Sequence, residues 1–193
     1  AGRIALAHSR PKQSTGSVKK TRDKHQTSVS NLNNMNNTVI RSAKEEDFLG
    51  ITALYRQSYI PHRKAHPKIF KATPKYPLSR GSFLNILEDE NELMMVAEKE
   101  GLIIGFINAS IEKDDGNHIH KAYRRVSIDD LCVNQKERRR GIGKDLLRSA
   151  EKWAEGKGIA ELTIIVFHFN NIAMHFYADL SYKPITTRLT KHT

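Results

Sequence analysis

The chain has 193 residues, 38% of them hydrophobic, one cysteine and a formal charge of +11. This length supports one well-buried core and argues against a second full domain. A single cysteine excludes an internal disulfide and a cysteine-based metal cluster, and it fits a reducing compartment. The longest apolar stretch, residues 102–109, is far shorter than the ~20 residues that a membrane-spanning helix requires, so we expect a cytoplasmic protein without membrane contact.

The positive charge is concentrated at the start of the chain. Residues 1–38 hold seven Lys or Arg and one acid, a net charge of +6 that leaves +5 for the remainder. Residues 1–37 are also rich in Ser, Thr, Asn and Gln without a sustained apolar period, a composition typical of disorder. We expect a basic tail over residues 1–37, either native or added, and one folded domain over residues 38–193.

Regular structure is predicted from the end of this tail onward. Residues 38–43 alternate like a short strand, and residues 44–59 have the apolar spacing of an amphipathic helix. Residues 60–80 contain four prolines and are predicted to be a long, irregular connection with at most a helical turn at residues 64–66. Residues 81–92 are predicted to form a second helix.

Strands and helices then alternate to the end of the chain. Residues 92–113 are predicted to form two strands around a turn at residues 99–101. The remaining predicted elements are a strand at 123–134, a helix from 144, a strand buried on both faces at 160–167, a helix at 170–180 and a last strand at 182–191. This order predicts an α/β fold with a mixed, mostly antiparallel central sheet flanked by helices.

A turn rich in arginine and glycine separates the strand at 123–134 from the helix that follows. The first amides of a helix lack intrahelical partners and the helix dipole adds positive charge, so an anion is favoured there. Gly141 and Gly143 would allow close approach of a phosphate. The pattern lacks the Lys-Ser/Thr pair of a P-loop and the third glycine of a dinucleotide fingerprint. On these residues alone, a phosphate site and a plain surface loop are both open.

Two segments carry a resemblance to a known family. Arg138-x-x-Gly141-x-Gly143 resembles the Arg/Gln-x-x-Gly-x-Gly/Ala motif of the GNAT superfamily of acetyl-CoA-dependent N-acyltransferases. The sequence NNIAMHFYADLSYKP is similar to the closing segment of that family. The matching residues there are Asn170, Ala173, Phe176, Tyr177 and Tyr182. Ser181 stands where the family usually has Gly, and the resemblance covers residues 38 to about 190.

The resemblance implies the GNAT fold and acetyl-CoA as co-substrate. The backbone amides of the arginine-glycine turn would hold the pyrophosphate of coenzyme A. These residues are Arg138, Arg139, Arg140, Gly141, Ile142, Gly143 and Lys144. Leu131, Cys132 and Val133 would leave their neighbouring strand and offer backbone groups to the pantetheine arm, and Asn170 would contact the cofactor from the other side.

Acetyl transfer to an amine needs a proton acceptor for the amine, stabilisation of the oxyanion and a proton donor for the thiolate. The resemblance places Tyr177 at the coenzyme sulfur, as the expected donor. Ser127 occupies the position of the glutamate base of some members and cannot act as a base, so Asp129 and Asp130 are the candidate bases, acting through water. Further candidates are His118, His120, His168 and His175. Cys132 is expected to be a small hydrophobe without nucleophilic function, and no metal site is expected.

The sequence therefore predicts an N-acetyltransferase that moves the acetyl group of acetyl-CoA directly to a primary amine of a small molecule or peptide. Two alternatives stay open. One is a GNAT-fold protein that binds acyl-CoA without turnover, and the other is a basic nucleic-acid-binding module. The nucleic-acid alternative is disfavoured because the tail supplies most of the excess charge and no reader motif is present. The acceptor is not visible in the sequence, and a homodimer is left open.

Overall fold

The computed structural model of the protein describes residues 38–72 and 77–191. The predicted tail over residues 1–37 lies outside the described residues. Five strands form one sheet: β1 (Thr38–Ser42), β2 (Glu92–Lys99), β3 (Leu102–Asp114), β4 (Tyr123–Val133) and β5 (Leu162–Ile164). The α-helices are α1 (Phe48–Ala65), α2 (Arg80–Glu88), α3 (Ile142–Gly156) and α4 (Asn171–Asp179), with short 3-10 turns at Glu45–Asp47 and Gln135–Glu137.

The strand order in the sheet is the order in the sequence, β1-β2-β3-β4-β5. The first four strands pair antiparallel, and β5 pairs parallel with β4 through the α3 crossover. This confirms the predicted mixed, mostly antiparallel sheet flanked by helices. None of the helices within the described residues is both long and apolar enough to cross a bilayer.

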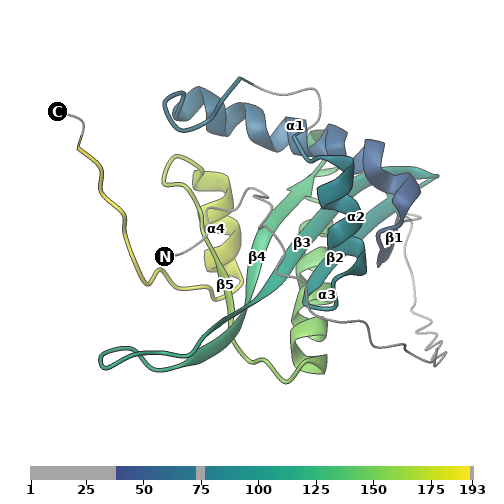
Figure 1. The fold of residues 1–193 in the computed structure, drawn as a ribbon. Coiled ribbons are helices and arrows are strands. Elements are labelled where there is room, and N and C mark those ends of the chain that lie inside the picture. The colour runs from purple at the N-terminus through teal and green to yellow at the C-terminus, as the bar shows by residue number, and fades with distance from the viewer. Residues whose placement is uncertain (1–37, 73–76, 192–193) are drawn as a thin grey trace.

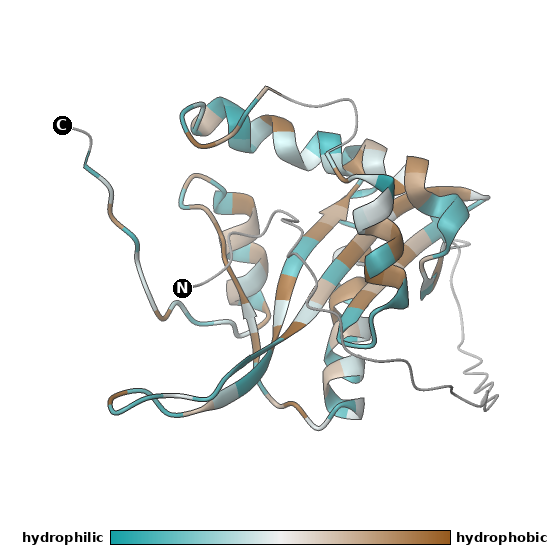
Figure 2. Cartoon of the chain, viewed as in Figure 1, coloured by the Kyte–Doolittle hydropathy of each residue, from teal (hydrophilic) through white to brown (hydrophobic). Residues whose placement is uncertain are grey.

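Helices cover both faces of the sheet (Figure 1). The alternation of strand side chains sorts the apolar residues to the two faces, and the strands alternate in hydropathy along their length (Figure 2). Val96 and Phe106 are buried with the residues of α1 and α2. Their sequence neighbours Ala97 and Ile107 are buried on the other face with α3 and with Tyr177 of α4. The sheet is therefore the middle layer of a three-layer domain.

The first helix is longer than the sequence predicts. α1 continues through Pro61 to Ala65, whereas an irregular connection was predicted from residue 60. Proline normally ends a helix because it lacks an N–H group, but here the last turn is held from outside. The hydroxyl of Tyr59 and Nε of Arg63 both donate to the carbonyl of Lys71, at 3.0 and 2.9 Å. Tertiary contacts thus override the local signal.

The end of the chain departs from the prediction in two ways. β5 pairs over Leu162–Ile164 only and is half-buried, whereas the sequence predicted a strand over 160–167 buried on both faces. No strand forms at residues 182–191. Ile185 and Leu189 are 78% and 89% exposed, so this segment buries no apolar face that would stabilise strand pairing.

Candidate active site

β4 and β5 separate beside the glycine turn. Their pairing ends at Ile128 and Ile164, although β4 continues for five more residues to Val133. The separation of residues 131–133 from the neighbouring strand, expected from the family resemblance, is therefore confirmed. A β-bulge lies at the same place, because Asn108 pairs with Asp130 and the next pair along β3 is Ala109 with Ile128. The bulge leaves Asp129 as the extra residue of β4.

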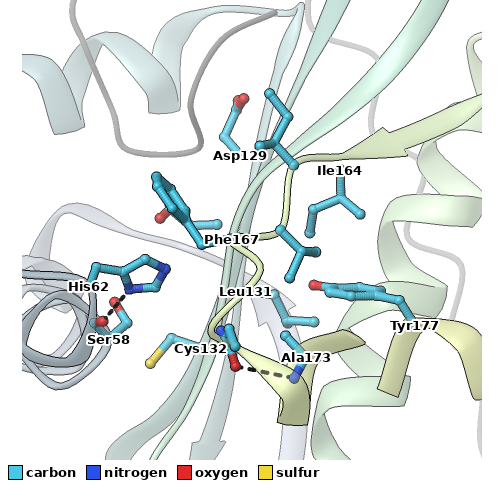
Figure 3. Close-up of a pocket in the computed structure, with 13 residues that line it drawn as sticks. Ser58, His62, Asp129, Leu131, Cys132, Ile164, Phe167, Ala173 and Tyr177 are labelled. Atoms are coloured by element: carbon cyan, nitrogen blue, oxygen red, sulfur yellow. Dashed lines mark hydrogen bonds between the residues drawn. The ribbon is translucent and has the colours of Figure 1, made fainter. Parts of the chain in front are cut away.

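A cavity of about 80 Å³ lies where the two strands part. α1, β4, the segment after β5 and α4 each contribute to its wall (Figure 3). The lining residues are Ser58, His62, Asp129, Asp130, Leu131, Cys132, Ile164, Ile165, Val166, Phe167, Asn170, Ala173 and Tyr177. The cavity thus brings together Tyr177, Asp129, Asp130 and Asn170, which the sequence analysis had selected from separate segments.

Asp130 is half-buried, and α1 holds its carboxyl group in place. The hydroxyl of Tyr55 donates to Oδ2 of Asp130 at 2.6 Å, and the Tyr55 ring packs against Phe106 with centroids 4.6 Å apart. Burial raises the pKa of Asp130 from its ordinary 3.8 to about 8, against the lowering effect of the Tyr55 hydrogen bond; the charge of Asp129 raises it further. At neutral pH this carboxyl is therefore largely protonated.

Asp129 occupies the opposite side of the bulge. It is 8% exposed, and its Oδ1 accepts a hydrogen bond from the hydroxyl of Ser127 at 3.3 Å. Ser127, which the resemblance aligned with a glutamate base, therefore contacts a neighbouring carboxyl group. The bulge therefore places two carboxyl groups, from consecutive residues, in one cavity wall.

Tyr177 faces the cavity from α4. It is 7% exposed, and its ring packs against Phe176 and Tyr182 with centroids 5.1 and 5.4 Å apart. Burial raises the pKa of its hydroxyl well above 10, and the nearby Tyr182 and Asp130 raise it further. The hydroxyl is therefore protonated throughout the neutral range and can donate a proton or a hydrogen bond.

Cys132 lines the cavity as an unreactive thiol. Its sulfur donates to the carbonyl of Leu54 at 3.3 Å. Burial raises the pKa of the thiol to about 12, although the positive charge of Arg138 acts in the opposite direction. Since the thiolate is the nucleophilic form, this environment supports the interpretation of Cys132 as a packing residue.

The glycine turn forms the start of α3. Gly141 is the N-cap residue with φ of 85°, a left-handed conformation that favours glycine, and the first helical bond runs from the amide of Asp145 to the carbonyl of Gly141 at 3.1 Å. The preceding amides belong to the helix start, where intrahelical acceptors are lacking. A Cβ atom on Gly143 would lie 3.5 Å from the Phe176 ring and 3.8 Å from Val133, so side chains already occupy that side.

Two of the three arginines of the turn have contacts within the turn region. Arg138 donates through Nε to the carbonyl of Val133 at 3.2 Å, and Arg140 pairs with Glu137 at 2.9 Å. Arg139 adopts a left-handed conformation with φ of 64°. The backbone amides at the start of α3 are therefore suited to bind an anion, and the arginines shape the turn.

Asn170 is the N-cap residue of α4. Its side-chain oxygen accepts from the amide of Ala173 at 3.2 Å, the usual role of an asparagine at the start of a helix. Because Asn170 also lines the cavity, the start of α4 is fixed beside the place where β4 and β5 separate.

His62 is the cavity residue that the sequence analysis missed. It lies one residue after Pro61, in a segment that was predicted to be irregular, and the extension of α1 brings it to the cavity. The predicted alternatives His118, His120, His168 and His175 are all exposed and lie outside the cavity lining. The described residues contain no group of three or more His, Cys, Asp or Glu side chains arranged to hold a metal.

The comparison with protein families decides the identity of the domain. Residues 50–182 match the acetyltransferase (GNAT) family. The chain belongs to this family. The GNAT domain is accordingly an N-acetyltransferase with acetyl-CoA as its co-substrate, and the matched range contains both the glycine turn and the Tyr177 segment.

Individual relatives agree with this assignment. Aminoglycoside N(6')-acetyltransferase type 1 of Salmonella typhimurium is 26% identical over 98 residues, which cover 51% of this chain and 67% of that protein. A tetramutant of the BH1408 protein of Bacillus halodurans has the same fold, with a TM-score of 0.76 and 20% identity over 80% of this chain and 99% of that one. Aminoglycoside N-acetyltransferase AAC(6')-Iy in complex with CoA has a TM-score of 0.64 and 20% identity, over 84% and 98% of the two chains.

Proposed function

We propose that this GNAT domain transfers the acetyl group of acetyl-CoA directly to a primary amine that enters the cavity from the α1 side. One observation carries the proposal: the end of β4 that has no β5 partner precedes the glycine turn and lines a cavity together with a protonated phenol and two carboxyl groups. The relatives named as aminoglycoside N-acetyltransferases support an amine-bearing acceptor as the substrate class.

The donor site would lie along the end of β4 and the start of α3. The amides of residues 138–144 would bind the pyrophosphate of coenzyme A, with Gly141 and Gly143 allowing the backbone to approach it. Leu131, Cys132 and Val133 would offer backbone groups to the pantetheine arm, because this part of β4 has no β5 partner. Asn170 would contact the same arm from the α4 side.

The acceptor side would use the two aspartates at the bulge. An amine reaches the protein mainly as an ammonium ion, because an aliphatic amine has a pKa near ~10. Asp129 and Asp130 line the same cavity. We propose that Asp129 attracts this ammonium group and that the carbonyl oxygen of the protonated Asp130 accepts a hydrogen bond from it, which holds it beside the thioester. Their carboxyl oxygens offer it hydrogen-bond acceptors.

Chemistry follows once both substrates are in place. The amine nitrogen attacks the thioester carbonyl carbon, a tetrahedral oxyanion forms, and its collapse breaks the carbon–sulfur bond. Tyr177 would protonate the departing thiolate, because its buried hydroxyl keeps its proton at neutral pH. The product amine carries the acetyl group and the coenzyme leaves as a free thiol.

The test is the release of free thiol from acetyl-CoA with a panel of amines and peptides. Tyr177→Phe should lower kcat by about 100-fold or more while acetyl-CoA still binds, since general acid catalysis contributes about 10²–10⁴-fold. Tyr182→Phe is the matched control, because it removes a hydroxyl from the adjacent ring and lies outside the cavity. Saturable acetyl-CoA binding without thiol release with any acceptor would contradict acetyl transfer and support a binding role.

A further inference from the structure

We infer that His62 is the catalytic base that takes the proton from the acceptor amine. This inference rests on the proposed function and names the group that the sequence analysis sought among the residues of β4. Three features of the structure carry it: the hydrogen bond of the His62 ring, the contacts that fix the ring, and its position in the same cavity as the two aspartates.

The hydrogen bond determines which ring nitrogen is available. Nδ1 of His62 lies 2.8 Å from the carbonyl oxygen of Ser58. A carbonyl oxygen only accepts, so Nδ1 carries the hydrogen, and in a neutral imidazole the other nitrogen, Nε2, is then the acceptor. Figure 3 shows this second nitrogen pointing away from the α1 backbone, toward Phe167. The bond to Ser58 also survives protonation, because both nitrogens of an imidazolium donate.

Aromatic contacts hold the ring in this orientation. Phe167 and Phe169, from the segment after β5, meet the His62 ring edge-on with centroids 5.3 and 5.0 Å apart. Phe70, from the loop after α1, contacts it from a third direction at 5.8 Å. A base must be positioned before the reaction to be effective, and these rings together with Ser58 restrict the motion of the imidazole.

In this cavity, different residues bind the amine and remove its proton. β4 brings Asp129, Asp130 and Cys132 to the same cavity as His62, and Tyr177 closes it from α4. Asp130 already accepts the Tyr55 hydroxyl, and Asp129 accepts the Ser127 hydroxyl. The ring nitrogen of His62 that does not bond Ser58 is a proton acceptor at this cavity, and histidine is the most frequent general base in enzymes.

The proton balance closes with these residues. The ammonium group gives one proton to Nε2 of His62, and the nitrogen lone pair then forms the bond to the carbonyl carbon. When the carbon–sulfur bond breaks, the electron pair leaves on sulfur, which takes the proton of the Tyr177 hydroxyl. A second nitrogen proton passes to solvent, the phenolate takes one back, and His62 releases its proton. The net products are the amide, the free thiol of coenzyme A and one proton.

The experiment compares His62→Gln, His62→Ala and His66→Gln in the thiol-release assay with an acceptor that the wild type acetylates. We expect His62→Gln to lose about 100-fold or more in kcat with the KM for acetyl-CoA unchanged. Imidazole added to His62→Ala should restore part of the rate in proportion to its concentration. His66→Gln is the control, because His66 packs against the same Phe167 and Phe169 rings and lies outside the cavity lining.

The outcomes separate this inference from the proposed function. If the wild type releases thiol and His62→Gln does so at the same rate, the inference is wrong and the acetyltransferase proposal stands. Loss of activity in Asp129→Asn or Asp130→Asn that imidazole rescues, with His62→Gln unaffected, would place the base on β4. Absence of amine-dependent thiol release in the wild type would overturn both proposals.

Discussion

Asp130 joins the chemistry of the cavity to the stability of the fold. It is half-buried and accepts the Tyr55 hydroxyl, and its pKa is raised to about 8 mainly by desolvation of the carboxyl group. Between pH 4 and 8 the folded chain therefore keeps a proton on this carboxyl that the unfolded chain has lost. A folded state that binds more protons than the unfolded state loses stability as the pH rises. The environment of Asp130 therefore destabilises the fold most above pH 8.

Asp130→Asn removes this pH dependence. Asparagine cannot ionise, and its side-chain oxygen can still accept from Tyr55. We expect the variant, compared with wild type by urea denaturation, to be more stable relative to wild type at pH 8 than at pH 5. Asp115→Asn, at an exposed position in the β3–β4 loop, should show the same difference from wild type at both pH values. An equal difference for Asp130→Asn would mean that this carboxyl ionises normally.

Sequence reasoning found some cavity residues and missed others for identifiable reasons. Asp129, Asp130 and Tyr177 were found because each lies within a predicted element whose family motif fixes its position. His62 was missed because Pro61 precedes it. A proline predicts the end of a helix, so His62 was not expected to lie on α1. The contacts of Tyr59 and Arg63 with Lys71, which keep that turn helical, join residues that no local pattern connects.

At the scale of elements, the start of α3 is the feature that the sequence predicted best. The motif, the strand before it and the amphipathic helix after it all have local signals, and the structure has β4 and α3 on either side of the turn. The strands after α3 were predicted less well. The end of β5 and the absence of a strand at residues 182–191 depend on whether a partner strand is within reach, which periodicity does not report.

Gly143→Val tests the role of the α3 start. A side chain there would crowd Phe176 and Val133 and obstruct the approach of a phosphate to the amides. We expect the affinity for acetyl-CoA to fall by about tenfold or more, about 1.4 kcal/mol, in a calorimetric titration of a variant that stays folded. Gly156→Ala, at the other end of the same helix where an added Cβ meets nothing within 4 Å, should bind acetyl-CoA normally. Unchanged affinity in Gly143→Val would place the pyrophosphate elsewhere.

At the scale of the whole molecule, all residues assigned to the proposed donor site come from the end of β4, the turn and start of α3, and the N-cap of α4. A chain that lacks residues 1–34 is therefore expected to bind acetyl-CoA with the affinity of the 193-residue chain, although it loses most of the excess positive charge. Calorimetric titration of both chains at the same ionic strength measures this. A clear loss of affinity on truncation would mean that the basic segment takes part in binding the coenzyme.

The separation of β4 and β5 affects how the two substrates can bind to the enzyme. The cavity is lined by α1, which covers one face of the sheet, and by α4, which covers the other. Under the proposed function we therefore expect donor and acceptor to be bound at the same time. A geometry of this kind favours a ternary complex over an acylated enzyme, in agreement with the inert thiol at Cys132.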